Sequence, residues 1–177
     1  MKEHLNEIVS VDDFSKTYNH FGFAQRAVEI SKSKNWLPLK DYPFIARLVA
    51  YLIGDGNLSK DRMIGDFRFY GSYEKLCDIM KSMKIMFNLE HHSCYSHPHG
   101  GCYILRYNNC IFSRILELAG VPRGNKIATP FLVPSWIMNS SNNIKRNFLS
   151  ALFSDEMGKI YKNKYGVWSG LKFKMSK

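Results

Sequence analysis

Residues Leu48–Gly56 read Leu-Val-Ala-Tyr-Leu-Ile-Gly-Asp-Gly, an apolar run that ends in an aspartate between two glycines. One hundred residues later, Phe148–Glu156 reads Phe-Leu-Ser-Ala-Leu-Phe-Ser-Asp-Glu and reaches its acid at the same point. Each run has the character of a short buried helix. A single helix that ends in a solvated aspartate is common, but two copies in register are not expected by accident. The repeat predicts two related helices with Asp55 and Asp155 at corresponding ends.

Each copy also has small residues at every fourth position. They are Ala46, Ala50 and Gly54 in the first copy, and Ser150 and Ser154 in the second. Residues four apart share one helix face, and small side chains there allow two helix backbones to approach closely. We expect the helices to pack through these faces and to bring the two aspartates together.

The double motif resembles the LAGLIDADG family of homing endonucleases, in which the two motif helices form the interface between half-domains. By this resemblance Asp55 and Asp155 are the catalytic and metal-binding carboxylates, and the metal is Mg²⁺ or Mn²⁺, held through oxygen ligands. The first copy keeps the family's closing Gly-Asp-Gly, whereas the second continues with Glu156–Gly158. The resemblance implies site-specific cleavage of double-stranded DNA by a hydrolase associated with intron or intein mobility.

The composition agrees with a nucleic-acid partner. The chain has 177 residues and a formal net charge of +10, from 25 basic and 15 acidic side chains, which favours a polyanionic ligand. Its apolar runs stay well below the ~18 residues of a membrane span, and its first residues lack the hydrophobic segment of a signal peptide. We therefore expect a cytoplasmic protein without a membrane partner.

The order of predicted elements gives the fold class. Residues 43–120 read as α-β-β-α-β-β-α, which predicts an α+β fold whose sheet keeps one polar face. This order is also that of a LAGLIDADG half-domain. We divide the chain into a helical extension (1–40), a first half-domain (41–140) and an incomplete second half-domain (141–177) with a motif helix and one hairpin. In the extension, Asp12-Asp13 is predicted to cap the first helix, and DNA contact and simple packing both remain open roles.

The polar sheet face is the predicted DNA-binding surface. Arginine can bond guanine in the major groove and tyrosine can reach phosphate, although an ordinary solvated sheet face is also charged. The residues expected to contact DNA are Lys60, Arg62, Arg68, Tyr70, Arg106 and Tyr107, with Lys159, Lys162 and Lys164 in the basic tail.

One lysine is singled out by the resemblance. Relatives of the intein type carry Gly-x-Lys after the last helix of the half-domain, and here Gly124-Asn125-Lys126 stands in that place. The resemblance makes Lys126 a catalytic residue beside the acids. By position alone it would be an ordinary surface lysine.

The second repeat begins near Ile144 and has room for only a motif helix and one hairpin, and the counterpart of Lys126 would fall near position 226. We therefore expect a truncated or decayed second half-domain. Self-association of two chains would complete the DNA-binding saddle. A non-catalytic DNA- or RNA-binding protein, such as a regulator or a maturase, is therefore an alternative function. A basic protein-interaction domain is a third.

The segment from His91 to Cys102 holds four histidines and two cysteines in twelve residues. Such residues can bind zinc, but the spacing contains no Cys-x-x-Cys pair. A polar hairpin turn explains the same residues.

Overall fold

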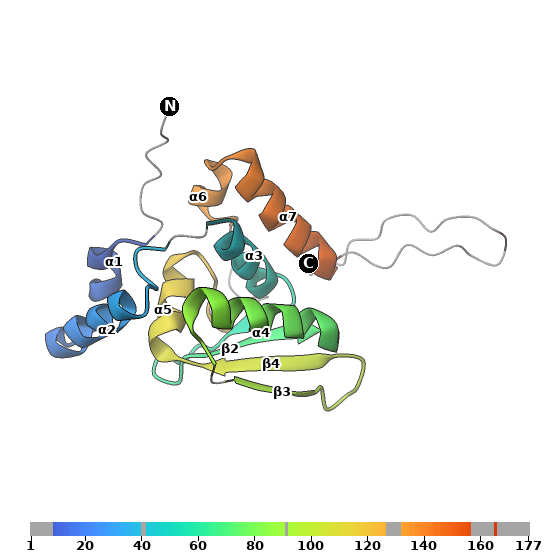
Figure 1. The fold of residues 1–177 in the computed structure, drawn as a ribbon, viewed down its shortest axis with the longest axis horizontal. Helices are drawn as coiled ribbons and strands as arrows, with labels where there is room; N and C mark the ends of the chain where they lie inside the picture. The colour runs from blue at the N-terminus through green and yellow to red at the C-terminus, as the bar shows by residue number, and fades with distance from the viewer. Residues whose placement is uncertain (1–8, 40–41, 91, 127–131, 157–164, 166–177) are drawn as a thin grey trace.

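The computed structural model describes residues 9–39, 42–90, 92–126, 132–156 and 165. Within them the protein is α+β, with helices packed on one face of a small antiparallel sheet (Figure 1). The helices are α1 (Val11–Lys16), α2 (Phe21–Ser33), α3 (Tyr42–Ile53), α4 (Tyr73–Phe87), α5 (Cys110–Leu118), α6 (Ser135–Met138) and α7 (Asn142–Glu156). The strands are β1 (Asn57–Leu58), β2 (Asp66–Gly71), β3 (His92–Ser96) and β4 (Tyr103–Asn108). The order from α3 to α5 is α-β-β-α-β-β-α, as predicted.

The strands are ordered β1-β2-β4-β3, so the two longest strands form the centre of the sheet. Their register pairs Phe67 with Tyr107 and Arg68 with Arg106. Because successive side chains of a strand point to opposite faces, the two pairs lie on different faces. Phe67 and Tyr107 are fully buried and stack at 5.3 Å between ring centroids. They belong to the face that the helices cover.

This register corrects one prediction. Tyr107 was expected on the polar face beside Arg106, but adjacent residues of a strand cannot share a face. Tyr107 is 0% exposed, and burial raises the pKa of its hydroxyl above the usual range. It is a core residue.

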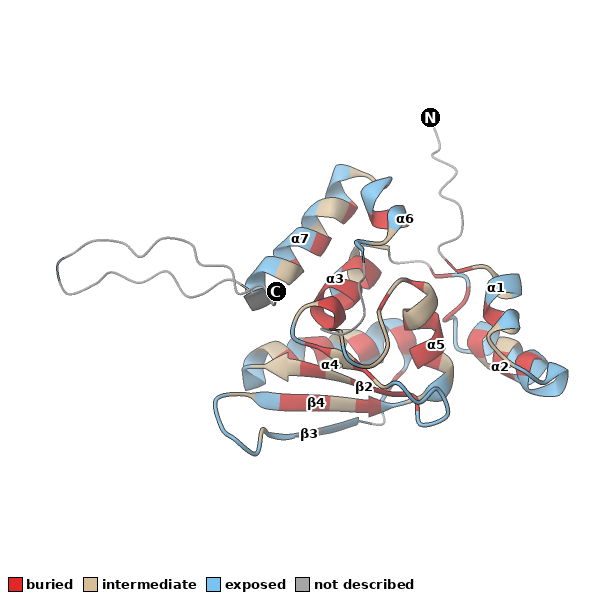
Figure 2. Cartoon of the chain, turned by 180° about the vertical axis from the view of Figure 1, so that it is seen from behind, coloured by how far each residue is buried: buried red, intermediate tan, exposed pale blue. Residues whose placement is uncertain are grey.

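The central helix is α3, which lies between the sheet and α7 (Figure 2). Every residue from Leu48 to Ile53 is buried. Pro43 lies in the first turn, where a missing N–H group costs nothing. A helix that is apolar on nearly every side is stable when it is enclosed in this way, and the exposed Arg47 is the exception in α3.

The other motif helix, α7, is buried on one side only. Its buried residues Ile144, Phe148 and Ala151 recur at helical spacing. Ser150 and Ser154 are exposed instead. The prediction that these serines form the helix interface was therefore wrong, because larger side chains of α7 occupy that face. Ala46 and Ala50 of α3 are 0% exposed, and α3 packs against α7.

The N-terminal helices α1 and α2 pack against α5. Arg114 of α5 donates a hydrogen bond to the Thr17 carbonyl, and its guanidinium lies 4.0 Å from the centroid of the Tyr18 ring. The cap of α1 is Ser10, whose hydroxyl accepts from the Asp13 N–H at 3.0 Å. The predicted Asp12-Asp13 cap is thus shifted, and both acids lie in the first turn.

None of the helices in the described part of the chain has the length and hydropathy that a membrane crossing requires.

Candidate functional site

Asp55 follows the last turn of α3 and is exposed. Helical hydrogen bonding continues to Gly54, whose N–H donates to the Ala50 carbonyl at 2.8 Å. Gly56 then turns the chain toward β1, and its N–H donates to the Tyr51 carbonyl at 2.8 Å. A Cβ at position 56 would lie 2.7 Å from that carbonyl oxygen, so only glycine fits. The Gly-Asp-Gly sequence thereby places a carboxylate at the surface, at the end of a buried helix.

Lys126 lies against the same helix end, although it is 126 − 55 = 71 residues further along the chain. Its ammonium donates hydrogen bonds to the carbonyls of Leu52 at 3.2 Å, Ile53 at 2.9 Å and Gly54. The last carbonyls of a helix lack partners within it and carry partial negative charge, which makes a lysine favourable there. The fold thus brings Lys126 to the residue that precedes Asp55. Its chemical role remains a prediction.

The loop that carries Lys126 is fixed by Arg123, whose side chain is 9% exposed. Arg123 Nε donates to Glu117 Oε2 at 2.7 Å, and Nη1 donates to the Ser59 carbonyl at 2.9 Å. The Gly124 N–H donates to a β1 carbonyl at 2.8 Å. These bonds tie the loop to α5 and to the sheet, and so determine where Lys126 lies.

Two of the predicted DNA contacts lie beside this loop. Arg62 is 52% exposed and donates through Nη2 to Glu117 Oε1 at 2.5 Å. Lys60 is exposed and lies against Gly124. Burial alone would raise the pKa of Glu117, but the hydrogen bonds from Arg62 and Arg123 outweigh it and lower the pKa. Glu117 therefore stays ionised and binds both arginines.

A second lysine near Asp55 was not predicted. Lys75 of α4 is half-buried, and its Nζ lies 4.4 Å from the centroid of the Tyr51 ring. Burial lowers the pKa of Lys75 to about 8, although the charge of Asp55 acts in the opposite direction. In the sequence Lys75 is one lysine of an amphipathic helix, so only the packing of α4 beside α3 reveals its position.

The open face of the sheet carries a charged cluster. Arg68 donates to Asp66 Oδ2 from Nε at 3.0 Å and from Nη2 at 2.5 Å. Arg106 forms an ion pair with the other oxygen, Nε to Oδ1 at 3.0 Å. Tyr70 lies on the same face and is half-buried. Of the residues predicted on this face, Arg68, Tyr70 and Arg106 are therefore brought together.

Asp155 lies in the last turn of α7, where only its backbone is among the described residues. The predicted DNA contacts Lys159, Lys162 and Lys164 lie outside the described residues. The predicted second hairpin also lies outside them, except for Tyr165. The meeting of the two carboxylates therefore remains a prediction.

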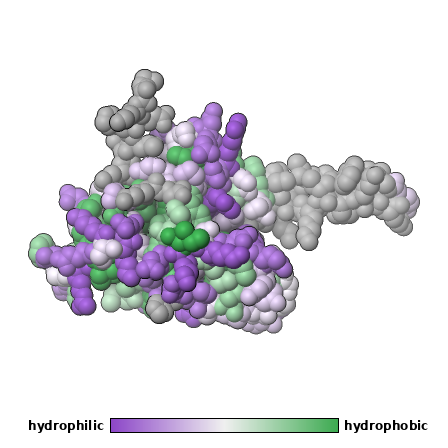
Figure 3. All heavy atoms as spheres, viewed as in Figure 1, coloured by the Kyte–Doolittle hydropathy of each residue, from purple (hydrophilic) through white to green (hydrophobic). Residues whose placement is uncertain are grey.

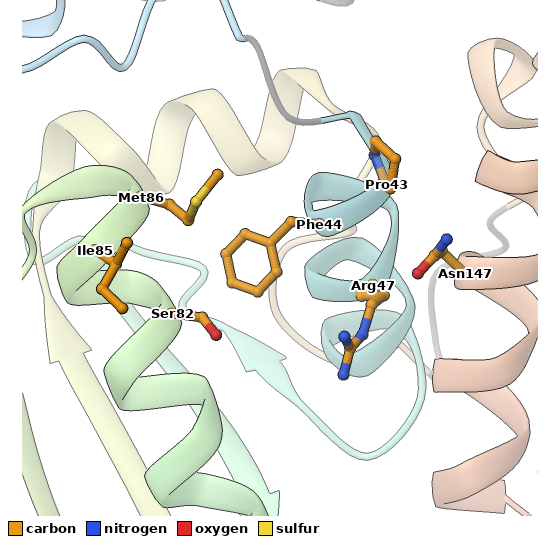
Figure 4. Close-up of a pocket in the computed structure, with 7 residues that line it drawn as sticks. All are labelled: Pro43, Phe44, Arg47, Ser82, Ile85, Met86 and Asn147. Carbon is orange, nitrogen blue, oxygen red and sulfur yellow. The ribbon is translucent and has the colours of Figure 1, made fainter.

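A groove lies between α3, α4 and α7. Arg47 and Asn147, which the repeat pairs at a separation of one hundred residues, both line it (Figure 4). Ile85, on the α4 side, is 79% exposed. Figure 3 shows hydrophilic and apolar atoms interspersed on this side of the molecule, with a small strongly apolar patch near its middle. Asp55 is about 12 Å further along α3 than Arg47, at 1.5 Å per residue, so the groove is separate from the acid.

Within the described residues, no three His, Cys, Asp or Glu side chains are grouped closely enough to hold a metal ion. In the histidine turn, the rings of His97 and His99 lie 5.5 Å apart. The four cysteines are free thiols. Asp55 offers an exposed carboxylate at the negative end of a helix, and such an oxygen donor suits Mg²⁺.

No protein-family model matches the chain. It is 32% identical over 146 residues to the tRNA-splicing ligase RtcB of Pyrococcus furiosus, covering 72% of this chain and 15% of the ligase. It is 29% identical over 164 residues to the replication factor C small subunit of Methanocaldococcus jannaschii, covering 85% of this chain and 9% of that subunit. It is 24% identical over 196 residues to the DNA-directed RNA polymerase subunit Rpo1N of the same organism, covering 96% of this chain and 14% of that subunit. The chain thus spans only a small part of the curated relatives that it matches.

Proposed function

We propose that this chain is a homing-type DNA endonuclease, or a part of one, that hydrolyses phosphodiester bonds of double-stranded DNA with a divalent metal ion. The observation that carries the proposal is the meeting of Lys126 with the end of α3 that presents Asp55. The same type of helix, α7, packs beside α3 and carries Asp155 in its last turn.

The residues of the chain can divide the chemistry as follows. Asp55 and Asp155 would supply oxygen ligands for Mg²⁺ or Mn²⁺ and would orient the attacking water. Lys126 places a positive charge beside the scissile phosphate, where charge develops in the transition state. A bound metal ion would add Lewis-acid stabilisation of the same charge.

DNA would bind along the open face of the sheet. Arg68 and Arg106 have 35% and 37% of their side chains exposed there, while Lys60 and Arg62 lie at one edge. The net charge of +10 supports a polyanionic partner. Most of the affinity would come from phosphate contacts and would fall steeply with salt.

The comparisons support a transferable module. A ligase, a replication factor and a polymerase subunit have different named activities, and each is matched over 15% or less of its length. The segment that all three proteins share is therefore not tied to any one of these activities. This distribution is expected of a mobile element that occurs within unrelated genes.

The experiment is a cleavage assay on a randomised duplex library in Mg²⁺ or Mn²⁺, with capture and sequencing of new ends. We expect metal-dependent ends that disappear in Asp55→Asn and Asp155→Asn. The matched control is Asp78→Asn, an exposed acid of α4, which should cut normally. Duplex binding without any new ends would overturn the catalytic proposal.

A non-catalytic DNA- or RNA-binding protein is the second candidate. One observation favours it: Lys126 already bonds three backbone carbonyls and so stabilises α3 without any reaction. Under this alternative, both aspartate variants would bind nucleic acid as the wild type does. Association of two chains to complete a saddle would fit either function, and light scattering with and without DNA would detect it.

A further inference from the structure

The cluster on the open sheet face contains a buried acid between two partly exposed arginines. The Asp66 side chain is 6% exposed, whereas those of Arg68 and Arg106 are more than one-third exposed. Its two oxygens are divided between the arginines, Oδ2 facing Arg68 and Oδ1 facing Arg106. One carboxylate therefore lies against two guanidinium groups, with hydrogen bonds from Arg68 and an ion pair without hydrogen-bond geometry to Arg106.

The strand register makes this acid necessary. Arg68 and Arg106 are directly paired across β2 and β4, and like charges at such positions repel each other. Asp66 is two residues before Arg68 on the same face, where its charge offsets the repulsion. Without it, the two arginines would turn away from each other.

The contacts with Asp66 leave N–H donors of the arginines available to a ligand. An arginine has five N–H donors. Arg106 approaches Asp66 most closely through Nε, and neither of its Nη groups donates a hydrogen bond among the described residues. Arg68 uses Nε and Nη2 for Asp66, and its guanidinium also interacts with the Tyr70 hydroxyl. Two Nη groups held in a plane match the O6 and N7 acceptors of guanine in the major groove.

A purely structural role explains less. A buried ion pair is weak support for stability, because desolvation offsets much of the attraction. One arginine would suffice to neutralise Asp66, yet two lie at directly paired positions of the face that the helices leave open.

We propose that Asp66 is a specificity residue that acts through Arg68 and Arg106, so that Arg106 reads a guanine in duplex DNA and Arg68 contacts the neighbouring base or phosphate. This inference rests on the proposed DNA-binding function and extends it to one positioning residue. Asp66 itself does not touch DNA.

The test is selection of bound duplexes from a randomised library, with wild type, Asp66→Asn and Arg106→Lys compared at equal salt. Asp66→Asn removes a negative charge from the DNA face, so simple electrostatics predicts tighter binding with the same base preference. The proposal predicts instead that preference for guanine at one position falls by about 5- to 150-fold, the range for one bidentate contact. Arg106→Lys keeps the charge and should lose the same preference, since a lysine cannot form the planar pair.

Asp78→Asn is the matched control and should select the wild-type sequence. Unchanged selectivity in both Asp66→Asn and Arg106→Lys would overturn this inference and leave DNA binding intact. Failure of the wild type to bind duplex DNA would overturn both proposals. Binding of single-stranded RNA by the wild type, without duplex binding, would have the same consequence.

Discussion

The Lys126 ammonium donates a 2.9 Å hydrogen bond to the carbonyl of Ile53, at the end of the helix that presents Asp55. Two further bonds reach the neighbouring carbonyls of Leu52 and Gly54. Lys126 is therefore a helix cap as well as a candidate catalytic residue. The two roles are separable, because one affects folding and the other affects cleavage.

The substitution Lys126→Met should reduce both the stability of the fold and the rate of cleavage. Loss of the charged donor from these half-buried carbonyls should lower the free energy of unfolding by about 1–3 kcal/mol. Loss of one stabilising charge at the phosphate should slow cleavage by about 10²- to 10³-fold. Urea unfolding and the cleavage assay measure the two effects. Lys81→Met, an exposed lysine of α4, is the control, and equal stability of both variants would contradict the capping role.

Glu117→Gln should destabilise the loop of Lys126 in a pH-dependent way. The pKa of Glu117 is lowered in the folded state, so its stabilisation is complete above the unfolded pKa of about 4.3 and is lost as pH falls through the folded pKa. We expect Glu117→Gln to cost about 1–3 kcal/mol at pH 7. The difference from wild type should shrink below about pH 4.5.

Thermal unfolding from pH 3 to pH 7 measures this effect. Glu29→Gln, an exposed acid of α2, serves as the control and should stay close to wild type. A Glu117→Gln deficit that is constant with pH would exclude the charge as its cause.

Much of the fold could be predicted because local patterns determine it. Apolar content identified α3, and the αββαββα order followed from alternation and turns. The phase of β4 was misjudged because residue type was used without counting along the strand, which placed Tyr107 beside Arg106. The face of α7 was misjudged because small residues suggested close packing, whereas Phe148 and Ile144 form the actual contact.

The site was only partly predictable. The motif itself indicated Asp55, and the family resemblance indicated Lys126. Lys75 and Asp66 could not be found in this way, because their importance comes from neighbours that are distant in sequence or on another strand. Tertiary packing, not local pattern, places Lys75 beside Tyr51 and divides Asp66 between two arginines.

Gly56→Ala should disrupt the turn that presents Asp55. Its Cβ would lie 2.7 Å from the Leu52 Cα as well as from a backbone oxygen, and backbone cannot move aside as a side chain can. We expect a loss of at least about 1–3 kcal/mol and of cleavage. In the control, Gly22→Ala in α2, the new Cβ has nothing within 4 Å. That variant should be neutral or gain up to about 1 kcal/mol. Equal unfolding midpoints for the two variants would contradict the close approach at Gly56.

Lys75→Met should change how stability depends on alkaline pH. The pKa of Lys75 is lowered to about 8 in the folded protein, against about 10.4 in an unfolded chain. Between about pH 8 and about pH 10.4 the unfolded state binds more protons at Lys75 than the folded state does. The contribution of Lys75 to stability therefore rises with pH in this range. It is least favourable below about pH 8, where the buried ammonium is fully charged. The advantage of Lys75→Met over wild type should therefore be greatest at pH 7 and should shrink toward pH 10. Urea unfolding in EDTA measures this, with Lys81→Met as the control. A difference that does not change between pH 7 and pH 10 would show that the Lys75 ammonium is not buried against Tyr51.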